Sequence, residues 1–161
     1  MKYILLALFL VLVASDTCIN PQGNPVDWYV IYQLPKKETN GDLEYAYIDN
    51  TIKEFQIYVD NPSFPPTAQS YKLNNKRNTY ITWNDDATNG DYKPKYDERV
   101  AHSKGLLAFN ENEGFYIIHS LPRFPFHNGD TIMNVLPNNA GFFGQTFFCM
   151  TINYTTAVNV L

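Results

Sequence analysis

Short strand-like runs separated by turn residues limit how this chain can fold more than any other sequence feature. In the first run the apolar residues Val26, Trp28, Val30 and Tyr32 alternate with other residues until Leu34-Pro35 stops it. We expect this run to form a strand with one clearly apolar face. Six further runs are rich in aromatic and β-branched residues and are bounded by turn residues, at residues 45–48, 55–59, 80–83, 105–109, 115–120 and 145–152.

Helical patterns are much weaker than strand patterns in this sequence. No window shows a strong 3.6-residue period, so we expect helices only around residues 63–73 or 85–99. The chain has 161 residues, 45% of them hydrophobic, which is enough apolar material for one ordinary core and not for two. No linker or repeat is visible. The sequence therefore predicts a single strand-rich globular domain.

The N-terminus has the layout of a secretory signal peptide. The uncharged run from Ile4 to Val13 follows Lys2 and precedes the small residues Ala14 and Ser15. This run is too short to span a bilayer. We expect cleavage after Ser15, so that residues 1–15 are a signal peptide and residues 16–161 form a soluble, exported domain.

The net charge excludes a general affinity for polyanions. The whole chain carries a formal charge of −4 at pH 7, and loss of Lys2 with the signal peptide brings it to −5. This charge opposes DNA phosphates. If the protein handles nucleic acid, binding must come from a local cluster of cations or from histidines that titrate at low pH.

Both cysteines remain after removal of the signal peptide. In an oxidising compartment the pair Cys18 and Cys149 is most simply one disulfide. A zinc site is the poorer interpretation, because nothing nearby supplies the close ligand spacing that zinc needs. One N-x-S/T sequon, at Asn153, is a candidate glycosylation site.

The first candidate for chemistry is the pair His102 and Lys104, two residues apart before the strand-like run at 105–109. Side chains two apart in an extended segment project from the same face. An imidazole can attack phosphorus or protonate a leaving oxygen, while an ammonium neutralises the phosphoryl oxygens. A phosphodiester site needs such a pair. The alternative is an exposed strand end.

Other candidates have ordinary structural interpretations beside the functional ones. His119 is in phase with Phe115 and Ile117, which favours a buried, hydrogen-bonded core histidine. His127 falls in a predicted turn and is expected to be an exposed loop residue. Asp85 and Asp86 follow a predicted strand, where they could bind a metal or act as acid and base, although a solvated turn is the commoner outcome. The glycine pattern of a nucleophile elbow and the Gly-Lys-Ser/Thr of a P-loop do not occur.

Several segments together resemble one known family, deoxyribonuclease II, in their order and spacing. They are Pro25–Pro35, Trp83-Asn84-Asp85, His102-Ser103-Lys104-Gly105, Gly114–Pro122 and Gly141–Cys149. The resemblance implies a phospholipase D-like fold of the α/β (α+β) type, a mixed β-sheet sandwich in which each of two similar halves carries one His-x-Lys motif. It also implies one composite active site without a metal ion or other cofactor, and a disulfide between Cys18 and Cys149.

Carried over residue by residue, the resemblance gives His102 as the catalytic histidine and Lys104 as the phosphate-binding lysine of the first half. His119 matches a histidine of the family's His-Ser-x-Pro segment and becomes a candidate catalytic residue. The family often has Asp at the position of Asn110, so a carboxylate that would orient the site is an amide here. The sequence contains one His-x-Lys motif, and the half that would carry the second is expected to be missing.

The resemblance therefore implies a secreted or lysosomal acid endodeoxyribonuclease of DNA catabolism that acts as a homodimer, since one His-x-Lys supplies only part of an in-line displacement. The alternatives are a catalytically inactive secreted protein that binds DNA or another partner, and a truncated product. We expect activity without metal, an optimum at mildly acid pH, products with a 3′-phosphate, and an exposed apolar surface where another half or copy docks.

Overall fold

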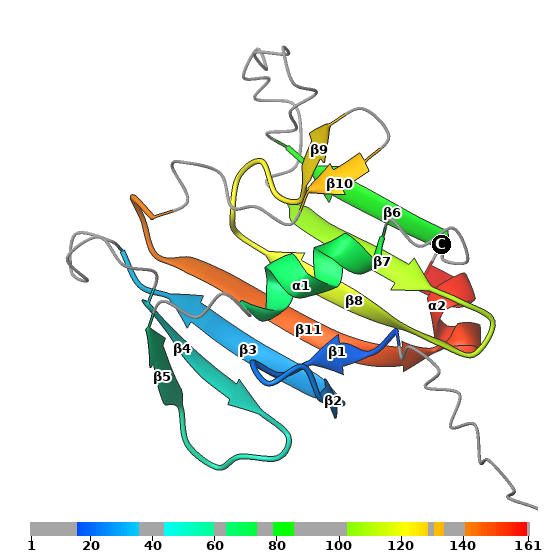
Figure 1. The fold of residues 1–161 in the computed structure, drawn as a ribbon. Helices are drawn as coiled ribbons and strands as arrows, with labels where there is room; N and C mark the ends of the chain where they lie inside the picture. Colours follow the sequence, from blue (N-terminus) through cyan, green and yellow to red (C-terminus); the bar gives the residue numbers. More distant parts are fainter. Residues whose placement is uncertain are drawn as a thin grey trace, which may run out of the picture.

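The structure is a computed structural model that describes residues 16–35, 44–59, 64–73, 79–85, 103–128, 131–133 and 141–160. A seven-stranded sheet in the order β5-β4-β3-β11-β8-β7-β6 forms its centre (Figure 1). The strands are β3 (Trp28–Gln33), β4 (Glu44–Asp49), β5 (Gln56–Val59), β6 (Thr79–Asn84), β7 (Lys104–Phe109), β8 (Glu113–His119) and β11 (Gln145–Asn153). All seven predicted runs are confirmed as the strands of this sheet.

The described pairings of the sheet are antiparallel throughout, so the expectation of a mixed sheet is corrected for this part of the chain. Consecutive strands such as β3, β4 and β5 lie side by side, and so do β6, β7 and β8. Antiparallel pairing permits strands that follow one another in the sequence to be neighbours in the sheet. The domain as described is strand-rich with two short helices, a mixed α+β class.

Smaller elements complete the fold. Strands β1 (Cys18–Ile19) and β2 (Pro25–Val26) pair with each other, as do β9 (Phe126–Asn128) and β10 (Thr131–Met133). Helix α1 (Pro65–Lys72) lies in the first region where a helix was expected, and α2 (Tyr154–Val160) was not expected. The second expected helix, and the predicted signal peptide, fall outside the described residues apart from Asp85.

The core lies between one face of the sheet and the layer that contains α1 and β1 (Figure 1). Alternate residues of the strands point into it, and it includes Tyr29, Ile31, Tyr45, Tyr47, Leu106, Phe115, Ile117 and Phe147. A disulfide joins Cys18 of β1 to Cys149 of β11, which confirms the pairing expected from the sequence. The Gln69 side chain of α1 is fully buried and donates to the Thr17 carbonyl oxygen at 3.1 Å beside this bond.

The opposite face of the sheet is covered by α2 at its β7 end, where Ala157 packs with Leu107 and Phe109. Nearer the centre of the sheet this face remains partly open. We call its exposed residues the outer apolar face; they are Trp28, Tyr32, Ile118 and Phe148, each at least 36% exposed. An exposed apolar surface is therefore present as expected, while docking of another half or copy on it stays a prediction. Trp28 and Tyr32 of the first strand-like run belong to it, because Tyr29, Ile31 and Gln33 take the buried positions of β3. Val26 of that run is in β2 and is buried.

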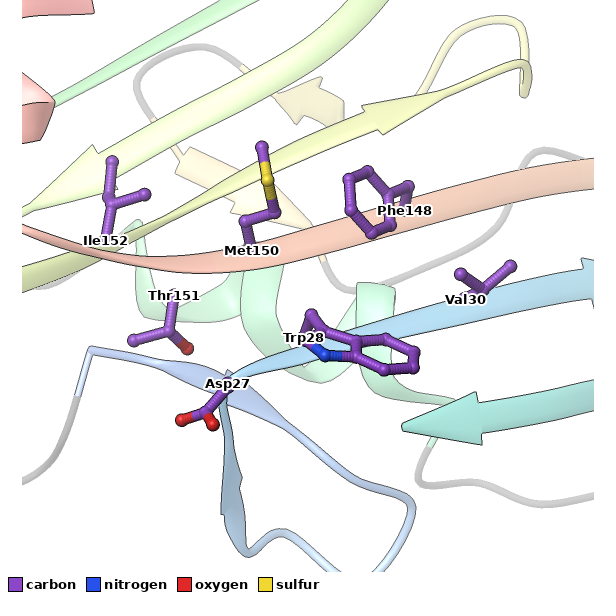
Figure 2. Close-up of a pocket in the computed structure, with 7 residues that line it drawn as sticks. All are labelled: Asp27, Trp28, Val30, Phe148, Met150, Thr151 and Ile152. Atoms are coloured by element: carbon purple, nitrogen blue, oxygen red, sulfur yellow. The ribbon is translucent and has the colours of Figure 1, made fainter. Parts of the chain in front are cut away.

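Figure 2 shows a hollow on the outer apolar face. Side chains of β3 and β11 line this hollow of about 530 Å³: Trp28, Val30, Phe148, Met150 and Ile152, with Asp27 and Thr151 at one end. Cross-strand pairing places Val30 beside Phe148 and Trp28 beside Met150. The hollow is therefore formed by side chains of the adjacent strands β3 and β11. Among the described residues, no helix has the length and apolar character needed to cross a membrane.

Candidate functional site

The His102-Ser103-Lys104-Gly105 segment leads into β7, but His102 itself lies outside the described residues. The Ser103 hydroxyl accepts a hydrogen bond from Trp83 Nε1 at 3.0 Å. A Cβ atom at Gly105 would lie 2.2 Å from Cζ2 of the Trp83 ring. The ring can therefore lie against the backbone only because residue 105 is glycine. These contacts fix the start of β7 against the end of β6.

Lys104 forms an ion pair with Asp85, and both side chains are buried, at 2% and 10% exposed. Asp85 comes directly after β6, and Asn84 pairs with Lys104 across the two strands. The expectation of a solvated turn at Asp85 is wrong. A buried ammonium is costly without a counter-charge, and the fold brings in the Asp85 carboxylate for that purpose. Asp86 lies outside the described residues.

His119 ends β8, next to Lys104 on the neighbouring strand, one residue beyond the Gly105–Ile118 pair. Its side chain is only 6% exposed. The ring stacks on Phe147 at a centroid distance of 5.5 Å and meets the edge of Phe124 at 5.3 Å. The expected burial is confirmed. The expected hydrogen bond is not, because neither ring nitrogen has a partner of good geometry among the described residues.

The surroundings of His119 keep its ring neutral. Burial lowers the pKa of His119 to about 4, and the positive charge of Lys104 acts in the same direction. The polar backbone of Leu121 raises the pKa of His119, but by less than burial and Lys104 lower it. At mildly acid pH this imidazole is therefore neutral and can accept a hydrogen bond.

Asn110, where the family often has Asp, is not near this site. Its side-chain oxygen accepts hydrogen bonds from the backbone nitrogens of Asn112 and Glu113 at 2.8 and 3.1 Å, and its amide donates to Asp16. This is a turn-stabilising arrangement between β7 and β8. Lys104 is at the other end of β7, about 20 Å away at roughly 3.3 Å per residue. The amide at this position therefore leaves the orientation of the site unaffected.

Two further residues singled out in the sequence are His127 and Asn153. His127 is in strand β9, paired with Ile132 of β10, and not in a turn as expected. Strand β9 extends through Asn128 and therefore includes the position of His127. Asn153 is exposed and accepts a hydrogen bond from the Thr156 backbone nitrogen at 2.8 Å, so it caps the start of α2.

The described site thus contains a buried ammonium, its carboxylate partner and a neutral imidazole at adjacent strand ends. An ammonium in a poorly hydrated site stabilises phosphoryl oxygens more strongly than one in water. No group of three or more His, Cys, Asp or Glu side chains that could hold a metal ion occurs in the part of the chain that the structure describes. The sequence favoured a solvated turn at Asp85 and did not predict its contact with Lys104. The segment Trp83-Asn84-Asp85 precedes the His-x-Lys motif and could have indicated that the two strand ends lie side by side.

Comparison with known proteins relates this chain to one family. The sequence model of the deoxyribonuclease II family matches residues 17–161 of this chain. The chain is 30% identical to Deoxyribonuclease-2-alpha of Bos taurus over 168 residues, which cover 98% of this chain and 46% of that protein. It is 35% identical to Deoxyribonuclease-2-beta of Homo sapiens over 126 residues, which cover 70% and 34% of the two chains.

A third relative, from Caenorhabditis elegans, supplies a similar match. The chain is 32% identical to Cell-death-related nuclease 7 of Caenorhabditis elegans over 142 residues, which cover 84% of this chain and 36% of that protein. In all three comparisons the matched region is less than half the length of the relative.

Proposed function

Because the chain belongs to the deoxyribonuclease II family, we propose that it acts on DNA phosphodiester bonds as an acid endodeoxyribonuclease with a phospholipase D-like fold. The observation that carries this proposal is the buried Lys104 ammonium, held by Asp85 beside a neutral His119. A fold keeps a buried charge at a cost. A site that must bind a phosphate in a water-poor pocket provides a reason for that cost.

In the proposed reaction the His102 imidazole attacks phosphorus and forms a nitrogen–phosphorus bond. The 5′ oxygen of the next nucleotide leaves and takes a proton from an acid on the far side. Lys104 stabilises the charge on the phosphoryl oxygens. Water then attacks phosphorus and gives a proton to the far-side group that had protonated the 5′ oxygen, the bond to His102 breaks, and the product keeps a 3′-phosphate. His119, kept neutral by its surroundings, is proposed to accept a hydrogen bond within the same site.

The acid on the far side requires a second histidine. We propose that a second copy of the chain supplies it, with His102 of each copy facing the other across a two-fold axis. One histidine must then be neutral and the other protonated, so the pH profile of cleavage is a bell set by two coupled sites. We expect the optimum at mildly acid pH, on either side of ~6.

The outer apolar face cannot by itself bring two such sites together. Cross-strand pairing places Phe148 beside Ile118 on that face and Phe147 beside His119 on the other. The site is therefore on the core side of the sheet. A dimer that shares the site would form at the strand ends near Lys104.

Export is proposed on the signal-peptide layout of residues 1–15 together with the Cys18–Cys149 disulfide, because such bonds persist in oxidising compartments. The destination would be the extracellular space or a lysosome. A glycan at Asn153 is compatible with the described contact, since the glycan is attached through the side-chain nitrogen while the oxygen caps α2.

The direct test is a plasmid-nicking assay at mildly acid pH in the presence of a chelator. Wild type is compared with His102→Ala and with His127→Ala, a matched loss of a histidine that has no role in the proposed reaction. We expect nicking by wild type and His127→Ala and none by His102→Ala. Equal activity in His102→Ala would remove the nucleophile from the proposal. DNA binding without cleavage would support the inactive binding protein.

A further inference from the structure

We propose that Asp85 is a positioning residue for Lys104, and that it holds the ammonium where the phosphate of the DNA substrate binds. The proposal rests on the proposed function and extends it to a carboxylate outside the His-x-Lys motif. The supporting observation is the ion pair between two buried side chains from adjacent strand ends. Asp85 is expected to act through Lys104 and not to contact the reacting atoms.

The first support is the burial of both partners. Lys104 has a long flexible side chain, which in water samples many rotamers. Here it is 2% exposed, and its charge is compensated by a carboxylate that is itself only 10% exposed. Removing one partner of such a pair leaves the other charge buried and uncompensated. The pair therefore restricts the position of the ammonium.

The second support is the way the end of β6 is anchored around Asp85. The Asn84 side-chain nitrogen donates to the Phe124 carbonyl oxygen at 3.0 Å, and Trp83 Nε1 donates to the Ser103 hydroxyl at 3.0 Å. Phe124 also packs against His119. The two residues before Asp85 are thus held by hydrogen bonds, one to the residue before Lys104 and the other to a residue that packs against His119. A carboxylate placed on an anchored backbone can define a position to within the tolerance that catalysis needs.

The chemistry is compatible with simultaneous contact to a phosphate. An ammonium has three donor hydrogens, so a bond to Asp85 does not prevent donation to a phosphoryl oxygen. A carboxylate near the site also repels phosphate, and its removal should strengthen DNA binding if it has no other role. Removal of the Asp85 charge should therefore weaken DNA binding if Asp85 positions Lys104. It should strengthen DNA binding if Asp85 only repels the phosphate.

The experiment uses the chain from residue 16 onward with four variants: Asp85→Asn, Asp85→Glu, Lys104→Met and the double variant Asp85→Asn/Lys104→Met. Glu111→Gln is the matched control, because Glu111 is an exposed carboxylate at the other end of β7. Each is measured for nicking rate in chelator, for affinity for a short DNA duplex, and for its thermal unfolding midpoint.

We expect Asp85→Asn to lower the nicking rate about 10- to 100-fold and to weaken DNA binding, while Glu111→Gln binds DNA as well as wild type or better. Asp85→Glu should restore part of the rate. The double variant should be no worse than Lys104→Met, because Asp85 acts through Lys104.

The proposal is overturned if Asp85→Asn nicks DNA and binds it like Glu111→Gln, or if the losses of Asp85→Asn and Lys104→Met multiply in the double variant. If Asp85→Asn fails to fold, Asp85→Glu decides, since a displaced carboxylate lowers the rate under positioning and leaves it unchanged otherwise. If wild type does not nick DNA, the proposed function fails, whereas the binding measurements still test Asp85.

Discussion

Single residues of this protein carry their chemistry through partners that are distant in the sequence. Lys104 was predicted as a phosphate-binding residue, but its carboxylate partner follows a different strand. A position next to a predicted strand end looks the same in sequence whether it is solvated or buried, so Asp85 could not be distinguished from an ordinary turn. Asn110 shows the converse. The difference from the Asp that the family often has at this position suggested an effect on the site, but the structure places Asn110 in a turn.

His119 links the stability of the fold to pH. The folded state keeps the pKa of His119 at about 4, below its ordinary value of 6.5. Between these values the unfolded chain binds a proton that the folded chain does not, so stability falls as pH decreases through this window. The loss approaches about 3 kcal/mol. We predict that His119→Gln removes this part of the pH dependence.

The measurement is urea unfolding of wild type and His119→Gln at several pH values across that window. Carboxylates titrate in both proteins, so the difference between the two curves isolates His119. Identical curves would show that the His119 ring is protonated normally in the folded state.

At the scale of elements, the strands were predictable and the smaller pieces were not. Each strand of the central sheet has its own local signal of β-branched and aromatic residues between turn residues. Strands β1, β2, β9 and β10 have two or three residues each, too few for a periodic pattern. Helix α2 begins with Tyr-Thr-Thr, a poor helical sequence, and it is stabilised by the Asn153 cap and by burial of Ala157. Such tertiary contacts cannot be seen in a sequence window.

The link between β1 and β11 should contribute much of the stability of the domain. The Cys18–Cys149 bond closes a sequence separation of 131. In the chain-entropy model a loop of that size contributes about 5 kcal/mol, which is an upper figure. We predict that Cys18→Ala/Cys149→Ala unfolds at a markedly lower denaturant concentration than wild type. An unchanged midpoint in guanidinium would show that the core alone holds β1 in place.

At the scale of the whole molecule, the two faces of the sheet have separate roles. One face buries the core and ends at the proposed site, while the outer apolar face exposes side chains such as Trp28 and Phe148. Strand periodicity predicted an apolar face in the first run. It could not show that this face is the exposed one, because the neighbouring residues Tyr29 and Ile31 are also apolar enough to form a core.

We predict that the outer apolar face causes association independently of the proposed site. Phe148→Lys should reduce dye binding and the apparent size at tens of micromolar protein, because it places a charge in the exposed hollow. Its nicking rate should equal that of wild type, since Phe148 is on the other face from His119. Size-exclusion chromatography and the nicking assay provide the two readouts. Loss of activity together with association would place the outer face in the active assembly.

We propose that the Lys104 end of the sheet is a phosphodiester site that needs no added metal. The most direct measurement is the nicking of supercoiled plasmid in chelator at mildly acid pH by wild type and by Lys104→Met, with analysis of the ends produced. We predict nicks with 3′-phosphate ends for wild type, and a nearly complete loss for a folded Lys104→Met. Cleavage that vanishes in chelator and returns with magnesium, or that is equal in the two proteins, would contradict the account.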